Sequence, residues 1–213
     1  MVGAGKSIGR LGAIYDRIAP LYDLLDLPFE LGRYRAIRSE VFKEVTGATR
    51  LLDCGIGTGR NLPYYPGGSE VTGIDLSTGM LARARRRARK LGRDIELAHA
   101  NVLDLPFADD TYCAATATFL FCVLPDELQP DALREIARVV KPGGRIVLLE
   151  YAFSENPLRR LVMRLWAPWI RFAYGAGFDR RTREHIAAAG LTIEQRRFVH
   201  ADIIVLIVAR VPG

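Results

Sequence analysis

The sequence predicts an α/β fold built around a doubly wound, mostly parallel sheet. Short apolar runs alternate with amphipathic segments of helical spacing, which is the order found when helices connect parallel strands. The apolar run 49–54 leads into three glycines at every second position between 55 and 59, where the chain has to turn. A second apolar run, 70–74, ends in Asp75. Ligands of such folds bind at the carboxyl ends of the strands, so these residues mark the expected binding crevice.

Length, composition and cysteine usage favour a single cytoplasmic domain. With 213 residues, 49% of them hydrophobic, the chain can bury one sizeable core. Its three cysteines lie in apolar runs without paired spacing, as expected of reduced, buried thiols. No window approaches the roughly 18 to 20 uninterrupted apolar residues of a spanning helix, and the first residues lack a signal-peptide pattern. We therefore expect one domain over residues 1–213.

The glycine turn and Asp75 together indicate a ligand that contains a nucleoside. Glycines let the backbone approach a ligand closely, and the following helix begins with unpaired N–H groups. Asp75 lies 20 positions after Gly55, where a carboxylate accepts hydrogen bonds from ribose hydroxyls. A dinucleotide fingerprint would need its third glycine where Arg60 stands, so NAD is disfavoured. An ordinary strand-to-helix turn is the alternative interpretation.

Two stretches resemble the S-adenosylmethionine site of class I methyltransferases: Asp53-x-Gly55-x-Gly57-x-Gly59, and the run 73–77 around Asp75. The resemblance covers roughly residues 11–152. It implies a Rossmann-like, seven-stranded α/β sheet that is mostly parallel with an antiparallel last strand. It also implies S-adenosyl-L-methionine as the cofactor and S-adenosyl-L-homocysteine as the product.

The same resemblance assigns roles within the cofactor site. It implies that Gly55, Gly57 and Gly59 border the methionine end, Asp53 helps to anchor the amino-acid part, Asp75 holds the ribose, Leu76 and Met80 flank the adenine, and Asn101 and Val102 meet its edge. Tyr22, Asn61 and Phe119 complete the predicted cofactor-binding set.

The N-terminal segment predicts a helical lid over residues 1–47. Apolar residues recur at helical spacing between 14 and 25, although Pro20 should break or kink the helix. The stretch 15–23 resembles the N-terminal Tyr-Asp repeat of quinone C-methyltransferases and small phospholipid N-methyltransferases, where it covers the cofactor and lines the acceptor pocket. We therefore expect Tyr15, Tyr22 and Asp23 to position or deprotonate the acceptor. The alternative is that both tyrosines only pack.

A basic helix should follow the glycine turn, with Ser77 as its N-cap and its end near Leu91. Its densely basic side and the net charge of +6 would suit nucleic acid, an anionic membrane or an acidic substrate. No aromatic residue is interleaved for base stacking, so a solvated helix face is favoured over a nucleic-acid site. Aspartates 104, 109 and 110 lack the spacing of a metal site, and we expect no metal.

The middle of the chain continues the α/β alternation, with strands at 94–98, 112–120 and 145–151 and a helix before the last of them. The end of the 112–120 strand lacks the motifs of enzymes that methylate nucleic-acid bases. Quinone C-methyltransferases typically carry Phe-Gly-x-Arg-Asn there and a serine two residues after the glutamate of the next strand. Phe121-Cys122-Val123 and Ala152 depart from both patterns.

An amphipathic, arginine-rich helix is expected over 157–172, capped by Asn156 and interrupted at Pro168. Its apolar residues share one face and include two tryptophans. Such a face suits either an anionic membrane surface or packing on the protein's own sheet, and the family resemblance favours the membrane. We expect residues 153–190 to form a helical insertion near the substrate side. A helix at 179–189 and an antiparallel strand pair, 191–198 and 203–209, complete the chain.

These observations predict an S-adenosylmethionine-dependent methyltransferase that acts on a lipophilic small acceptor. The preferred acceptor is the amine of phosphatidylethanolamine at an anionic membrane surface, with a thiol or a quinone ring carbon as alternatives. The protein would then be cytoplasmic and peripherally membrane-associated, and nucleic acid is not an expected partner. From another class, a non-catalytic S-adenosylmethionine-binding protein or an RNA-associated protein remains an alternative.

Overall fold

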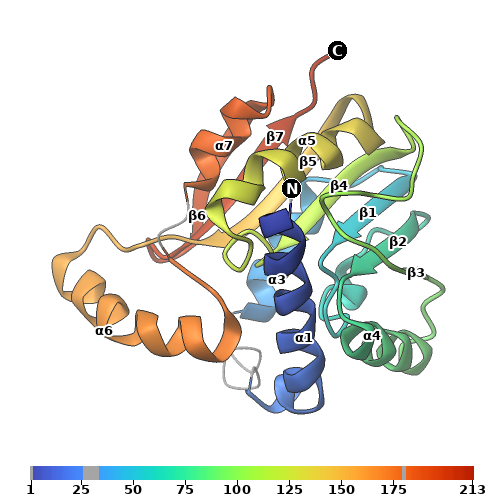
Figure 1. The fold of residues 1–213 in the computed structure, drawn as a ribbon. Coiled ribbons are helices and arrows are strands. Elements are labelled where there is room, and N and C mark those ends of the chain that lie inside the picture. The colour runs from blue at the N-terminus through green and yellow to red at the C-terminus, as the bar shows by residue number, and fades with distance from the viewer. Residues whose placement is uncertain (1, 26–33, 179–180) are drawn as a thin grey trace.

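The computed structural model, which describes residues 2–25, 34–178 and 181–213, confirms the predicted α/β architecture (Figure 1). Seven strands form one sheet in the order β3-β2-β1-β4-β5-β7-β6. Strand β7 runs antiparallel to both of its neighbours, and the other pairs are parallel. The strands are β1 (Arg50–Cys54), β2 (Glu70–Asp75), β3 (Glu96–His99), β4 (Tyr112–Thr118), β5 (Val140–Tyr151), β6 (Thr192–His200) and β7 (Ile204–Arg210).

Helices cover both faces of this sheet, as a doubly wound fold requires. They are α1 (Val2–Leu25), α3 (Tyr34–Lys43), α4 (Thr78–Lys90), α5 (Gln129–Val139), α6 (Pro157–Tyr174) and α7 (Thr182–Ala188). Short 3-10 turns lie at Leu62–Tyr64 and Asp126–Leu128. The predicted cap is confirmed, because the Ser77 hydroxyl accepts a hydrogen bond from the backbone N–H of Met80 at the start of α4.

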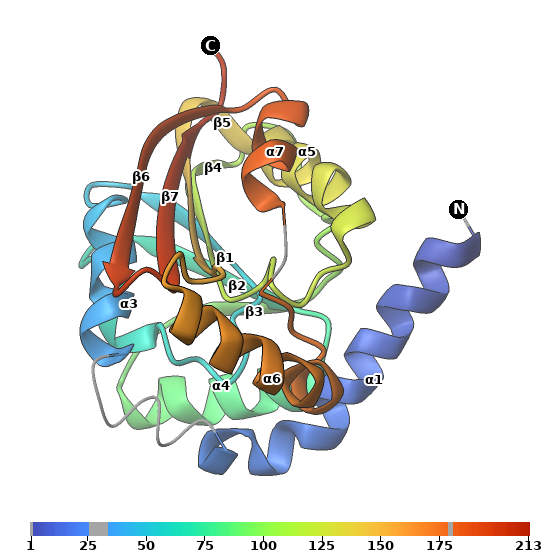
Figure 2. The same cartoon turned by 90° about the vertical axis from the view of Figure 1, so that its left-hand side faces the viewer.

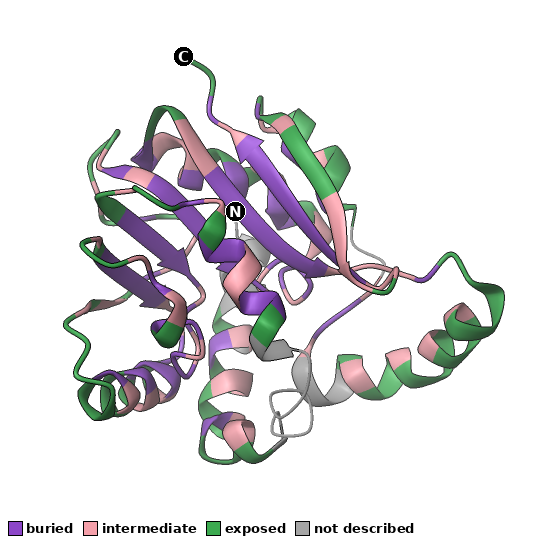
Figure 3. Ribbon diagram, turned by 180° about the vertical axis from the view of Figure 1, so that it is seen from behind, coloured by how far each residue is buried: buried purple, intermediate pink, exposed green. Residues whose placement is uncertain are grey.

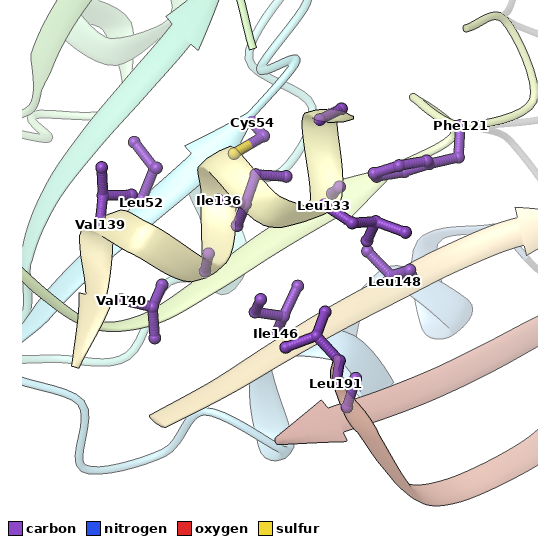
Figure 4. Close-up of a cluster of buried hydrophobic side chains, with 14 of the residues drawn as sticks. Leu52, Cys54, Phe121, Leu133, Ile136, Val139, Val140, Ile146, Leu148 and Leu191 are labelled. Carbon is purple, nitrogen blue, oxygen red and sulfur yellow. The ribbon is translucent and has the colours of Figure 1, made fainter. Parts of the chain in front are cut away.

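The core is divided by the sheet because successive strand residues point to opposite faces. On one face, Leu133 and Ile136 of α5 pack in the same cluster as Leu52 and Leu148 (Figure 4). On the other face, α3 contributes to a cluster that contains Leu51. Neighbouring residues of β1 therefore serve different layers.

Neither of the two prolines that were expected to disturb a helix ends one. Pro20 lies inside α1 and Pro168 inside α6, and both helices continue past them. Both prolines are exposed, so water can bind the carbonyl group that proline, lacking an N–H, leaves without its helical partner. The expected interruption at Pro168 is therefore wrong.

Helices α1 and α6 both lie beyond the carboxyl ends of the parallel strands (Figures 1 and 2). Helix α6 stands away from the sheet, and much of its surface is exposed (Figure 3). Among the described residues, no helix has the length and apolar character needed to cross a bilayer.

Candidate cofactor and acceptor site

A pocket that is partly open to solvent lies at the carboxyl ends of β1, β2 and β4, and residues of α1 line it. This is the place where open α/β sheets bind ligands. Of the residues predicted to bind the cofactor, those that line it are Tyr22, Gly55, Gly57, Asp75, Leu76, Met80, Asn101, Val102 and Phe119. Tyr15, which we predicted to be catalytic, also lines it.

Asp75 is held by backbone donors at the end of β2. Its carboxylate accepts hydrogen bonds of 2.9 Å from the backbone N–H groups of Gly57 and Ser77. Burial raises the pKa of Asp75 to about 6, although these hydrogen bonds oppose the shift. The carboxylate is thus fixed and mostly charged at neutral pH, as an acceptor for ribose hydroxyls needs to be.

The three glycines of the turn divide into two roles. Gly55 and Gly57 line the pocket and have positive φ angles, which favour glycine. Gly59 does not line it, and a Cβ atom built there would lie 2.7 Å from Leu62 and 3.2 Å from the Cα of Ala84. Close packing of the turn on α4 and a φ of 79°, also in the region that favours glycine, both account for this glycine.

Asp53 and Asn61 also lie outside the pocket lining. Asp53 is fully buried and accepts hydrogen bonds from Asn61 Nδ2 at 2.9 Å, Thr116 Oγ1 at 2.9 Å and the Tyr65 hydroxyl. Burial raises the pKa of Asp53 against these hydrogen bonds. In the structure, Asp53 organises groups behind the pocket wall, and its predicted contact with the cofactor stays a prediction.

Arg38 of α3 is a pocket residue that the sequence reasoning missed. Its side chain is 8% exposed and lines the pocket. Its Nη1 atom lies 3.0 Å from Asn61 Oδ1, and the guanidinium lies 5.6 Å from the centre of the Phe119 ring. The available signal was its spacing with Phe42 and Val45, both buried, which places Arg38 on the inner stripe of the helix.

Helix α1 is tied to the start of α4 by Asp16. The Asp16 carboxylate accepts hydrogen bonds from the Ser77 hydroxyl at 2.6 Å and from the backbone N–H of Gly79 at 2.9 Å. The hydrogen bond from Ser77 is the main reason why the pKa of Asp16 lies below its ordinary value. A carboxylate at a helix N-terminus is also favoured by the helix dipole.

Asp23 lies seven residues later on the same face of α1 and pairs with three arginines. Its carboxylate is 2.9 Å from Arg83, 2.9 Å from Arg87 and 3.2 Å from Arg60, and it accepts a hydrogen bond from Thr58 Oγ1. Burial acts to raise the pKa of Asp23, but the arginines and Thr58 outweigh it and the pKa is lowered.

The position of Asp23 favours a role in holding α1 against α4. It does not favour deprotonation of the acceptor, which is one of the two roles that the sequence suggested. Asp23 does not line the pocket, and a carboxylate with a lowered pKa is a weak proton acceptor. The prediction that the basic face of α4 is solvated is also corrected in part. Arg83 and Arg87 of that face are partly buried against α1, where they pair with Asp23.

An aromatic cluster lies at the β4 and β5 side of the site. The Phe119 ring stacks on Tyr151 at 4.8 Å between ring centres, and Phe178 meets Tyr151 edge-on at 5.6 Å. Phe119 has a φ of 57°, a strained conformation for a residue other than glycine, and such strain is common at functional sites. The ring centres of Tyr15 and Tyr22 of α1 lie 6.3 Å apart.

Glu150 holds the loop that follows β4. It is 3% exposed and accepts 2.8 Å hydrogen bonds from the backbone N–H groups of Phe121 and Cys122. Burial raises the pKa of Glu150 to about 8. The segment in which this chain departs from the quinone enzymes is therefore fixed through its backbone.

Comparisons with known proteins agree with this geometry. Residues 51–144 match a methyltransferase domain family. The chain is 35% identical to a demethylmenaquinone methyltransferase of Clavibacter sepedonicus over 76% of this chain and 68% of that protein. It is 38% identical to the one of Thermus thermophilus over 72% and 71%. It is 39% identical to the ubiquinone/menaquinone biosynthesis C-methyltransferase UbiE of Syntrophotalea carbinolica over 68% and 62%.

Solved structures with the same fold include methyltransferases. Geranyl diphosphate C-methyltransferase of Streptomyces coelicolor, solved with S-adenosyl-L-homocysteine, has a TM-score of 0.66 and 19% identity over 84% of this chain and 81% of that one. The YcgJ protein of Bacillus subtilis has a TM-score of 0.62 and 18% identity over 84% and 98%. The chain belongs to the class I S-adenosylmethionine-dependent methyltransferases and, within them, resembles the quinone C-methyltransferase group.

Proposed function

We propose that this methyltransferase alkylates a ring carbon of a lipophilic, quinol-type acceptor at an anionic membrane surface. The observation that carries the proposal is the apolar and aromatic end of the pocket. There Phe119, Leu120, Val123 and Leu124 line the wall, and Tyr151 stacks behind Phe119. Flat aromatic rings pack well against such side chains.

The residues present fit S-adenosylmethionine, which supplies an electrophilic methyl group when bound. Asp75 would accept hydrogen bonds from its ribose hydroxyls, and Leu76 and Met80 would pack on its adenine. Gly55 and Gly57 leave room for its amino-acid part. The chain's own contribution is alignment of the reacting groups, which alone lowers a barrier substantially.

Tyr15 and Tyr22 are the proposed positioning residues for the acceptor. They line the pocket from α1, so their hydroxyls can orient a polar group beside the methyl donor. Asp23 serves them indirectly, because its ion pairs hold α1 across the pocket.

The relatives favour the quinone acceptor over phosphatidylethanolamine, the acceptor that the sequence reasoning preferred. Several are named demethylmenaquinone methyltransferase, and phospholipid methylation has no comparable support. The departures at Phe121-Cys122-Val123 and Ala152 concern side chains. Glu150 fixes the first of these segments through backbone N–H groups, which tolerates changes of side chain.

The membrane surface is proposed from α6. Its exposed apolar side chains are Leu158, Leu161, Val162, Leu165, Trp166 and Trp169, of which Leu165 is 73% and Trp166 59% exposed. The alternative of packing on the sheet would have covered them. Exposed Arg164 on the same helix complements anionic headgroups, whereas Arg159 pairs with Asp202.

The test is turnover with three acceptors. The purified protein is given S-adenosylmethionine and phosphatidylglycerol vesicles that contain a reduced demethylmenaquinone, phosphatidylethanolamine or an aliphatic thiol. We expect S-adenosylhomocysteine formation and a product heavier by one methyl group with the quinol. Turnover only with the phospholipid or the thiol would contradict the acceptor, and no turnover with any of them would favour a non-catalytic role.

A further inference from the structure

The pocket has charged residues of opposite sign at its two ends. Asp75 lies at the end of β2, and Arg38 lies beside Thr118 at the end of β4. Strand β1, which leads into the glycine turn, separates these two strands. Among the described residues that line the pocket, Arg60 is also charged, and it pairs with Asp23 of α1. Arg38 is thus a cation at the end of the pocket that Phe119 and Leu120 line.

The guanidinium of Arg38 is held in place by a buried network. Its Nη1 atom donates to Asn61 Oδ1 at 3.0 Å and lies 3.5 Å from Thr118 Oγ1. Asn61 is fixed in turn by Asp53 and Thr118, each at 2.9 Å from its Nδ2 atom. A donor group whose position is fixed before the ligand arrives stabilises charge without reorganisation.

The surroundings strengthen any interaction of this cation with a ligand. Phe119 lies against the guanidinium, and Leu120, Val123 and Leu124 line the same part of the pocket. These apolar side chains lower the effective dielectric that a negative charge near Arg38 would experience, relative to the protein surface. Guanidinium groups also bind carboxylate and similar oxygens with high geometric preference.

We propose that Arg38 is the anion-binding residue of this pocket and holds a negatively charged oxygen of a bound ligand. Two ligands carry such an oxygen: the acceptor, as a phenolate, and the cofactor, as the carboxylate of its amino-acid part. The phenolate source rests on the proposed function, whereas the carboxylate source does not. A phenolate held there would keep the electron-rich form of the ring beside the methyl donor.

Arg38→Met and Arg38→Lys test the proposal, with Arg50→Met as the matched control. Arg50 also places its guanidinium over an aromatic ring, 5.7 Å from the centre of Tyr112, but it does not line the pocket. All variants are first compared by thermal unfolding. A change that Arg50→Met reproduces would reflect lost packing of a guanidinium on a ring.

Binding of the cofactor carboxylate by Arg38 is tested by measuring affinities calorimetrically for S-adenosylhomocysteine and for 5′-methylthioadenosine, which lacks the carboxylate. If Arg38 binds that carboxylate, Arg38→Met weakens S-adenosylhomocysteine binding at least tenfold and leaves 5′-methylthioadenosine within about twofold, while Arg38→Lys recovers part of the loss. Equal weakening of both ligands would show a general disturbance of the pocket and count against this source.

Binding of an acceptor phenolate by Arg38 is tested without turnover. The pKa of bound 4-nitrophenol is measured by spectroscopic titration with S-adenosylhomocysteine present. An apolar pocket alone raises the pKa of a phenol, whereas a nearby cation lowers it. We expect the wild-type protein to lower this pKa by about one unit, a tenfold preference for the phenolate, and Arg38→Met to reverse the shift.

The outcomes separate the inference from the proposed function. If Arg38→Met loses either the affinity for S-adenosylhomocysteine or the pKa shift of 4-nitrophenol, Arg38 is supported as the anion-binding residue. The assay that changes identifies which ligand carries the bound oxygen. If a folded Arg38→Met changes neither, the inference is overturned. If that variant does not fold, the sign of the 4-nitrophenol shift in the wild type and the calorimetry of Arg38→Lys decide. Neither assay requires methylation, so a wrong acceptor leaves the result interpretable.

Discussion

Helices α1 and α6 both lie beyond the carboxyl ends of the parallel strands and each contains an internal proline, yet their surroundings differ. Helix α1 reaches the body of the protein through two carboxylates two turns apart: Asp16 binds the start of α4, and Asp23 binds its arginines. Helix α6 is capped by Asn156 and held near its start by Asp202. Its apolar face is exposed. Apolar periodicity alone therefore does not decide whether a helix docks on its own domain.

The difference matches two tasks. Helix α1 contributes Tyr15 and Tyr22 to the pocket wall, and we propose that its ion pairs control access to the cofactor. Helix α6 presents leucine, valine and tryptophan side chains together with arginines. That surface suits delivery of a lipophilic acceptor.

The largest effect is expected from Leu165→Glu combined with Trp166→Glu. Burial of each apolar side chain contributes roughly 1.5–3 kcal/mol, so the double change should weaken binding to phosphatidylglycerol vesicles by about 100-fold or more in sedimentation assays. Leu91→Glu is the matched control, because Leu91 is also exposed but follows α4. Unchanged vesicle binding in the double variant would refute membrane docking by α6.

A smaller effect is expected on α1. Asp23→Asn removes three partly buried ion pairs, each contributing up to roughly 1 kcal/mol, so S-adenosylhomocysteine should dissociate about tenfold faster in stopped-flow measurements. Asp202→Asn serves as the control, since Asp202 accepts hydrogen bonds from Ser154 and Glu155 at the start of α6. If both variants release S-adenosylhomocysteine at the wild-type rate, the ion pairs of α1 do not retain the ligand in the pocket.

A fall in pH should weaken cofactor binding without releasing α1 from α4. The pKa of Asp75 is about 6, so its carboxylate gains a proton as the pH falls through 6 and loses acceptor capacity. The pKa values of Asp16 and Asp23 are lowered, so both stay charged at pH 5 and keep α1 docked.

Calorimetry should therefore show weaker S-adenosylhomocysteine binding below pH 6, by at most tenfold per pH unit for one proton. Asp75→Asn should bind weakly at every pH and lose this dependence. A wild-type affinity that is constant between pH 7 and pH 5 would contradict the assignment of Asp75 to the ribose.

The smallest effect is expected from Pro168→Ala. Removing a proline from a helix interior favours the helix locally, but α6 stands away from the core and contributes little to global unfolding. The melting temperature should stay within about 1 °C, while amide exchange around residue 164 slows. A rise of several degrees would mean that α6 belongs to the cooperative unit.

Local chemistry made much of the site predictable from sequence. The glycine turn, the carboxylate that ends β2 and the Ser77 cap depend on neighbouring residues, and the structure places Gly55, Gly57 and Asp75 in the pocket. The roles of Arg38 and Asp23 depend on partners 80 and 60 residues away in Thr118 and Arg83. No spacing rule reports such contacts. Docked and undocked amphipathic helices also share one periodicity, so the exposure of α6 required the fold.

In the proposed division of tasks, α6 delivers the acceptor while the pocket performs the transfer. This division is tested by the ratio of two rates: methylation of a quinol in anionic vesicles and of its water-soluble analogue without an isoprenoid tail. We predict that Leu165→Glu with Trp166→Glu lowers the vesicle rate at least tenfold and leaves the soluble rate within about twofold. Equal loss of both rates, or of neither, would contradict the claim.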